Sequence, residues 1–164
     1  MTAKDKDIES SPPVTIDRVD AEADLPEWLT REALGEFLHE SLKPYEDPLP
    51  GVLDGVDYAL TDDPCRGGFA LLAHVDRRLY GALVMLKTGM KGYVPENILL
   101  FVAVDPAARG QGIGGRLVRR GVKECEGDVK LHVEHDNPAR HLYERCGFSS
   151  KYLEMRWSRE SNHD

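Results

Sequence analysis

The feature that most constrains this chain is a glycine-rich turn in the stretch LLFVAVDPAARGQGIGG, Leu99 to Gly115. An apolar run of strand character, Ile98 to Val104, stops at Asp105-Pro106, and after the glycines apolar residues recur at helical spacing as far as Cys125. Four glycines within six residues cost a first helical turn about 1 kcal/mol each relative to alanine, which favours a functional reason for them. Glycine lets a phosphate approach the free N–H groups of a helix N-terminus. The turn therefore predicts a diphosphate cradle.

Length and composition restrict the class of protein. The chain has 164 residues, of which 41% are hydrophobic, and this suits one domain with one core. The net charge of −8 argues against a nucleic-acid partner. No apolar run has the length of a membrane span, and the charged start lacks a signal peptide, so we expect a cytoplasmic protein without a membrane partner. The three cysteines form no CxxC pair, so neither a zinc site nor a disulfide framework is expected.

Hydrophobic periodicity predicts an α/β fold of the α+β type, with a mixed, mainly antiparallel sheet flanked by helices. We expect one domain over residues 13–160, preceded by a disordered tail over residues 1–12. The predicted strands are 14–19, 67–75, 79–87, 98–104, 129–134 and one or two within 148–157. The predicted helices are 24–43 in two pieces, 52–60, the helix that ends near 125, and a short helix after His135-Asp136-Asn137-Pro138. Asp136 or Asn137 would be the N-cap of that helix, and Gly147 would follow its last turn.

Gly110, Gly112 and Gly115 also match the dinucleotide fingerprint GxGxxG, and Glu134 ends the next predicted strand, where a ribose-binding acid would lie. Two features weigh against a nicotinamide cofactor. Asp105 to Arg109 separate the strand from the first glycine, whereas in the fingerprint that glycine follows almost directly. The turn also follows antiparallel strands instead of opening a parallel series. A tight strand-to-helix connection without a ligand is the plain structural alternative.

The run RGQGIG, Arg109 to Gly114, fits the pattern Q/R-x-x-G-x-G/A, and with its flanking strand and helix it resembles the GNAT superfamily of N-acetyltransferases. The segment NPARHLYERCGF, Asn137 to Phe148, is similar to that family's second conserved segment. The close resemblance covers about residues 67–157, and the first 66 residues match only in outline. It implies acetyl-CoA as the acyl donor and an acyltransferase that uses no metal.

The resemblance also implies which residues bind acetyl-CoA. The main-chain amides that would hold its pyrophosphate belong to Arg109, Gly110, Gln111, Gly112, Ile113 and Gly114. The main chain of Val102, Ala103 and Val104 would pair with the pantetheine arm like an added strand, because the sheet of that family splays beyond this point. Asn137 would bond the same arm from the end of the neighbouring strand. A plain N-cap is the alternative for Asn137, and the two roles are compatible.

The sequence shows no Ser-His-Asp or Cys-His arrangement, so direct attack by a substrate amine is the simplest chemistry. Tyr143 falls on the family's acid position, six residues after Asn137, and its phenol could donate to the departing thiolate. The alternative is a tyrosine at the edge of the core. Histone-acetylating relatives carry a glutamate base where this chain has Ile98, so the base stays open between Glu96 and Glu134. Each of these could also be a solvated surface acid.

The acceptor is predicted only by class. The stretch from Pro44 to Pro64 carries six carboxylates and no lysine or arginine, and in the GNAT architecture this region helps to wall the acceptor side. Glu46 and Asp47 would favour a cationic amine, unless the stretch is an ordinary solvated loop. The acceptor would be a small molecule or a peptide. The alternative function is a non-catalytic acyl-CoA-binding or regulatory module. The sequence distinguishes neither a homodimer from a monomer nor acetyl from other acyl groups.

Overall fold

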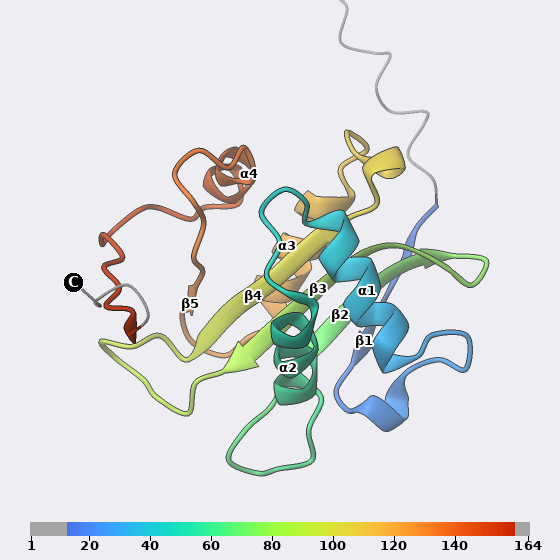
Figure 1. Ribbon diagram of the computed structural model, residues 1–164, viewed down its shortest axis with the longest axis horizontal. Coiled ribbons are helices and arrows are strands. Elements are labelled where there is room, and N and C mark those ends of the chain that lie inside the picture. Colours follow the sequence, from blue (N-terminus) through green and yellow to red (C-terminus); the bar gives the residue numbers. More distant parts are fainter. Residues whose placement is uncertain (1–12, 160–164) are drawn as a thin grey trace, which may run out of the picture. The chain divides into compact units, whose positions relative to one another are not determined.

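The computed structural model describes residues 13–159 (Figure 1). These residues fall into two compact units, one up to Leu131 and one from His132 onward, and each is described by itself. The tail predicted for residues 1–12 lies outside the described residues.

The first unit contains a five-stranded sheet whose strands follow in chain order. The strands are β1 (Thr15–Val19), β2 (Gly68–Val75), β3 (Arg78–Lys87), β4 (Asn97–Val104) and β5 (Val129–Lys130). The first three pairings are antiparallel and the β4–β5 pairing is parallel, which confirms the mixed, mainly antiparallel sheet. β1 lies at the edge of the sheet. Asp76 and Arg77 connect β2 to β3 with φ of 47° and 62°, the positive values that a two-residue type I′ hairpin turn requires.

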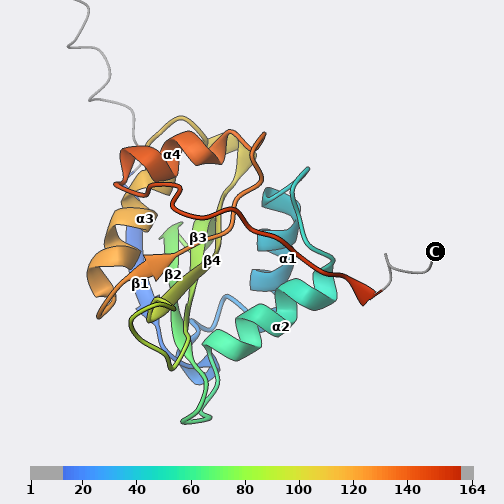
Figure 2. The same cartoon turned by 90° about the vertical axis from the view of Figure 1, so that its left-hand side faces the viewer.

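Three α-helices pack against this sheet, with α1 (Arg31–Ser41) and α2 (Leu49–Ala59) on one face and α3 (Ile113–Glu124) on the other (Figure 2). A 3-10 turn, η1 (Glu22–Asp24), precedes α1, which begins where the Thr30 side chain accepts a hydrogen bond from the Ala33 N–H. α2 begins before the predicted Val52 because Pro50 is tolerated in a first helical turn. The core under α1 and α2 includes Leu34, Leu38, Val52, Val56, Leu72 and Val84.

The second unit contains one short helix, α4 (Ala139–Arg145). The N-cap of α4 is Pro138, one residue later than predicted, and the Asn137 side chain before it accepts a hydrogen bond from the Ala139 N–H at 2.9 Å. Gly147 follows the last turn with φ of 96°, the left-handed value expected of a glycine that ends a helix.

Two strand predictions are wrong. The strand expected over residues 129–134 is ordered as a strand only at Val129 and Lys130, where it pairs with β4. Within the described residues, no strand forms over 148–157, and Leu153 and Met155 are each 91% exposed. Alternating apolar residues mark a segment that could form a strand, but a strand also needs a hydrogen-bonded neighbour, and local pattern does not supply one.

Candidate active site

β4 contains a bulge at Leu100. The β3–β4 register shifts between the pairs Val84–Phe101 and Met85–Leu99, so Leu100 is the extra residue. Leu99 and Phe101 would share a face in a regular strand. Here Phe101 lies in the core under α1 and α2, whereas Leu99 pairs with Met85, which faces α3.

Leu100 and Phe101 both pack toward α2. A Cβ atom at Gly55 of α2 would lie 2.6 Å from Leu100 Cδ2 and 2.8 Å from Phe101 Cε2, so glycine is what fits there. The bulge therefore sets how closely α2 approaches the sheet.

The β4–β5 pairing ends soon after it begins. Parallel partners exist only at Asn97–Val129 and Ile98–Lys130, so within the described residues the rest of β4 has ladder partners on β3 alone. Val102, Ala103 and Val104 lie on this part of β4. Their main chain is thus in a suitable place to pair with an extended ligand, although that role stays a prediction.

The glycine turn follows β4 through a 3-10 turn, η2 (Pro106–Ala108), which the Asp105 side chain caps by accepting from the Ala107 N–H. Gly110 and Gly112 have φ of 78° and 81°, and a Cβ atom built on either would meet nothing within 4 Å. Gly112 is the N-cap of α3 and has no side chain to offer its first amides. Open space beside left-handed glycines at a helix N-terminus fits the pyrophosphate of acetyl-CoA.

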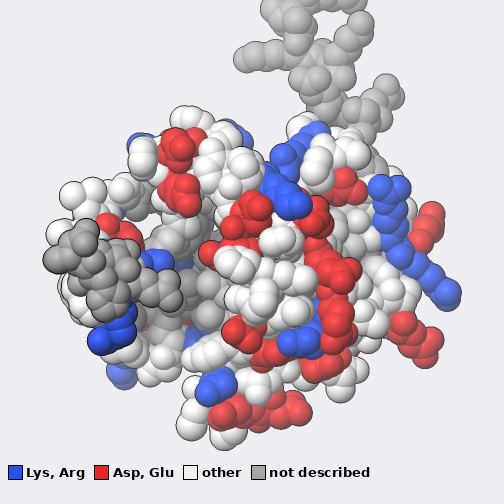
Figure 3. All heavy atoms as spheres, viewed as in Figure 1, with Lys and Arg blue, Asp and Glu red and all other residues white. Residues whose placement is uncertain are grey.

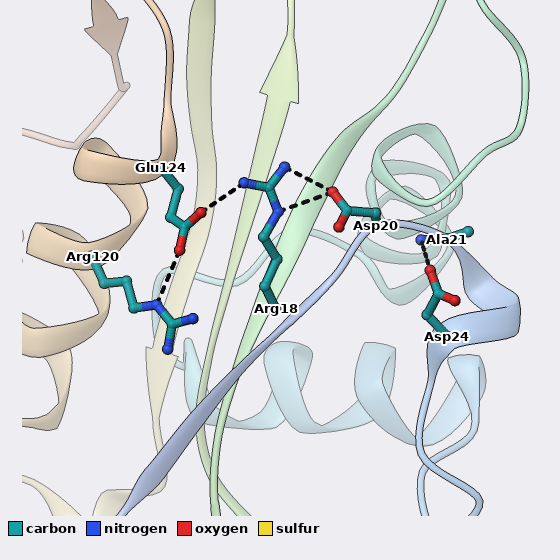
Figure 4. Close-up of polar contacts among 6 residues, drawn as sticks. All are labelled: Arg18, Asp20, Ala21, Asp24, Arg120 and Glu124. Carbon is teal, nitrogen blue, oxygen red and sulfur yellow. Dashed lines mark hydrogen bonds and ion pairs between the residues drawn. The ribbon is translucent and has the colours of Figure 1, made fainter.

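The flank of α3 is bonded to β1 by an arginine ladder. Its contacts are Arg116 to the carbonyl of Val14, Arg120 to the carbonyl of Ile16, and Glu124 to the guanidinium of Arg18 (Figure 4 shows the last). Four residues of helix rise about 6 Å, close to the length of two residues of strand, so positions 116, 120 and 124 match 14, 16 and 18. Arg18 and then Arg120 lower the pKa of Glu124. In the sequence, the helical spacing of these three α3 side chains is the sole sign that they line one side of the helix.

Glu96, one of the two predicted bases, holds the turn that joins α3 to β5. Its carboxylate accepts from the Asp128 N–H at 2.8 Å, and this bond is the main reason that its pKa is lowered. The neighbouring Asn97 is buried and its side chain donates to the carbonyls of Glu126 and Asp128. A carboxylate with a lowered pKa is a weaker proton acceptor, so this geometry favours a structural role for Glu96.

The other predicted catalytic residues belong to the second unit. Tyr143 is half-buried on α4 with its ring edge-on to Phe148, at 6.0 Å between centroids. Burial raises the pKa of Tyr143 to about 12, so the phenol keeps its proton at neutral pH and can donate a hydrogen bond. Asn137 caps the same helix, and Glu134 is exposed before it. The catalytic and cofactor roles of these three residues stay predictions.

Glu46 is half-buried and Asp47 exposed, both in the loop between α1 and α2. Acidic side chains gather over α1 and α2, with a few basic ones between them (Figure 3). Asp57, one of the six carboxylates of this stretch, accepts from Arg31 Nη2 at 2.6 Å. Arg31, which precedes the stretch, therefore partly balances its negative charge. The composition of Pro44 to Pro64 alone could not predict this pairing.

Residues 13–159 contain no group of three or more His, Cys, Asp or Glu side chains that could hold a metal ion. None of the helices there has the length and apolar character needed to cross a membrane.

A bulged central strand parts from its parallel neighbour and leads into a glycine turn at the open N-terminus of α3, and together these features define an α/β protein with the geometry expected of a phosphate-binding site. A family model described as an acetyltransferase (GNAT) domain matches residues 66–150, and the chain belongs to this family.

Solved structures support the fold assignment. An aminoglycoside N-acetyltransferase, AAC(6')-Iy, in complex with CoA superimposes with a TM-score of 0.62 at 14% identity, covering 92% of this chain and 98% of that one. A possible acetyltransferase from Clostridium difficile 630 gives a TM-score of 0.63 at 19% identity, covering 87% and 97%. At these identities the likeness shows the fold alone.

Sequence relatives match over shorter segments. A mycothiol acetyltransferase from Rhodococcus erythropolis is 41% identical over 63 residues, which are 35% of this chain and 21% of that protein. The uncharacterized N-acetyltransferase YjhQ of Escherichia coli is 33% identical over 107 residues, 60% and 59% of the two chains. The chain thus spans about a fifth of the length of the first relative and less than two thirds of the second.

Proposed function

We propose that the protein transfers an acetyl group from acetyl-CoA directly to a primary amine of a small molecule or peptide. The observation that carries the proposal is the open glycine turn at the N-terminus of α3, placed at the end of a bulged β4. Membership of the GNAT family supports the same reaction. Acetyl-CoA supplies the activated acetyl group, and the chain binds it and moves the protons.

The main-chain amides of residues 109–114 hold the pyrophosphate, since left-handed Gly110 and Gly112 leave room beside them. The main chain of Val102, Ala103 and Val104 pairs with the pantetheine arm, and Asn137 bonds it as well as capping α4. These contacts fix the thioester, so an incoming amine meets it in a defined orientation.

The transfer forms an N–C bond, breaks the C–S bond, and requires one proton to leave the amine and one to reach the thiolate. Tyr143 donates to the developing thiolate, because a phenol is protonated at neutral pH and Tyr143 occupies the acid position of the family segment. Glu134 is the proposed base, directly or through water, since the carboxylate of Glu96 is engaged by the Asp128 N–H.

A cationic small-molecule amine is the proposed acceptor. Two structural relatives are named as aminoglycoside acetyltransferases, one of them in complex with sisomicin, and the Rhodococcus relative is named for mycothiol. In this chain, Glu46 and Asp47 in the α1–α2 loop provide negative charge for such an acceptor.

The test is a screen of amines with acetyl-CoA, read by release of free thiol and by the product mass. The panel contains aminoglycosides, polyamines, amino acids, peptide N-termini and amino-thiol precursors, and calorimetry measures CoA binding in parallel. Thiol release with an N-acetylated product supports the proposal. CoA binding without turnover on any amine would favour the non-catalytic acyl-CoA-binding module, and failure to bind CoA would refute both.

Tyr143→Phe tests the acid. The substitution keeps the ring against Phe148 and removes only the hydroxyl, so turnover should fall by roughly 10²- to 10⁴-fold while acetyl-CoA affinity changes little. Tyr93→Phe, which alters an 83% exposed tyrosine between β3 and β4, is the matched control. Unchanged turnover of Tyr143→Phe under conditions where chemistry limits the rate would remove Tyr143 from the mechanism.

A further inference from the structure

Arg109 opens the phosphate cradle, but its side chain reaches a different part of the molecule. Its Nη2 donates to the carbonyl of Ser41 at 2.7 Å, in a partly buried bond between residues 68 positions apart. Its Nε donates a longer bond, 3.4 Å, to the carbonyl of Val104 at the end of β4. One guanidinium therefore joins the cradle, the end of β4 and α1.

Ser41 is the last residue of α1, and it is only 6% exposed. The last carbonyls of a helix have no partner within the helix and form the negative end of its dipole, so a cation bonded there is favourable. Figure 1 shows this end of α1 next to the end of β4. The bond thus satisfies a carbonyl that the helix itself leaves open.

The loop between α1 and α2 starts directly after Ser41 and carries Glu46 and Asp47, the residues proposed to face the acceptor. The first residue of the loop, Leu42, and the cradle are thereby linked through a single side chain. A phosphate bonded to the Arg109 main chain would restrict the Arg109 backbone, and the bond from its side chain to Ser41 would pass that restriction to α1.

We propose that Arg109 is a positioning residue that couples the cradle to the α1–α2 loop, so that CoA binding orders the loop that receives the amine. The inference rests on the proposed function, because it assumes that the cradle binds CoA. Coupling between two sites is reciprocal, so an acceptor that orders the loop should strengthen CoA binding by the same factor.

A matched control exists in the same region. Arg116 also donates from Nη2 to a main-chain carbonyl, that of Val14 at 3.0 Å, but this bond leads to β1 and not to α1. Arg116→Ala removes a contact of the same chemistry without touching the α1–α2 loop.

The experiment is amide hydrogen exchange with and without saturating CoA, on the wild-type chain, Arg109→Ala, Arg109→Lys and Arg116→Ala. In the wild-type chain and in Arg116→Ala, CoA should slow exchange both in the cradle, residues 110–114, and in the loop, residues 42–48. In Arg109→Ala the cradle should stay protected while the CoA-dependent protection of the loop falls about tenfold, the order expected for one charged hydrogen bond. Arg109→Lys retains a cation and should recover part of the protection.

The outcomes separate the two proposals. If CoA protects the loop equally in Arg109→Ala and in the wild-type chain, the coupling role is overturned and the cradle is untouched. If Arg109→Ala loses CoA binding itself, Arg109 acts as a phosphate ligand, which also overturns the coupling role. If the wild-type cradle gains no protection from CoA, the proposed function fails and this inference fails with it.

Discussion

The first turn of α3 and its flank are built in opposite ways. Residues 110–115 include four glycines, and Gly110 and Gly112 have open space where a side chain would be. Along the flank, Arg120 and Glu124 contact β1, and Arg116 contacts Val14 just before it. The difference separates two tasks of one helix. A ligand can approach the turn because Gly110 and Gly112 leave open space, and the direction of the helix is held by bonds made elsewhere.

The flank also protects the edge of the sheet. Edge strands present unpaired main-chain groups that can add a foreign strand. Arg116 and Arg120 donate to the carbonyls of Val14, just before β1, and Ile16 in β1, and carbonyls two residues apart in extended chain point to the same side. The arginine ladder therefore positions α3 and covers part of the exposed edge of β1 with the same bonds.

Gly112→Val should give the largest effect, because it breaks the turn and leaves the flank intact. A β-branched residue is strained at φ of 81° and would fill the open space beside the amides. Loss of one or two charged hydrogen bonds should weaken CoA binding by about 100-fold in calorimetry.

Gly89→Val is the control for that strain. Gly89 also has a positive φ, 70°, and no atom within 4 Å of a built Cβ, but it lies in the loop between β3 and β4. It should cost similar stability and leave CoA affinity unchanged. Normal CoA binding by Gly112→Val, or equal weakening in both variants, would show that the glycine turn is not the cradle.

Arg120→Ala tests the other half of the comparison, because it removes contacts of the α3 flank and leaves the glycine turn unchanged. It removes the bonds to the Ile16 carbonyl and to Glu124, so the free energy of unfolding should fall by about 1 kcal/mol in urea denaturation. Its exposed neighbour Arg119 serves as the control in Arg119→Ala. A loss of CoA affinity larger than the loss of stability would mean that turn and flank are not separate.

The pH dependence of the flank follows from Glu124. Its pKa in the folded state is lowered from 4.5, with Arg18 as the first cause, so the unfolded chain binds this proton more tightly. The stabilisation is therefore present above pH 4.5 and is lost as the pH falls through the lowered pKa. Glu124→Gln should flatten that part of the stability profile, and an unchanged slope would exclude Glu124 as a contributor.

The sequence predicted what depends on neighbours along the chain. Gly110 and Gly112 identified the turn, and Asn137 and Gly147 identified the ends of α4, because caps and left-handed turns select particular residue types. It could not predict the bulge at Leu100, the arginine ladder or the bond from Arg109 to Ser41, which join residues far apart in the chain. The strand expected around Leu153 failed for the related reason that pairing is a long-range property.

Substitution of Glu96 should have a smaller effect, and it tests whether this residue stabilises the turn after α3 or acts as the catalytic base. Glu96→Gln keeps an oxygen for the Asp128 N–H, so stability, turnover and the pH profile should stay near those of the wild-type chain. Glu96→Ala should lower the melting temperature by about 2–4 °C, because it releases the turn after α3. A large fall in turnover for Glu96→Gln, with loss of the limb of the pH profile that reports the base, would instead identify Glu96 as that base.

The smallest expected effect concerns charge on the acceptor side. Glu46→Gln combined with Asp47→Asn removes two negative charges from the α1–α2 loop and none from the glycine turn. If these charges attract a cationic amine, kcat/KM for the amine should fall with ionic strength in the wild-type chain, since exposed charges are screened over about 10 Å at 0.1 M salt. The double variant should raise the amine KM by about threefold and flatten the salt dependence, while acetyl-CoA, itself an anion, should bind no more weakly. Glu27→Gln combined with Glu36→Gln changes the net charge equally, away from the loop, and should leave both quantities unaltered. An identical salt response in the two double variants, or a preferred acceptor without positive charge, would contradict a role for Glu46 and Asp47.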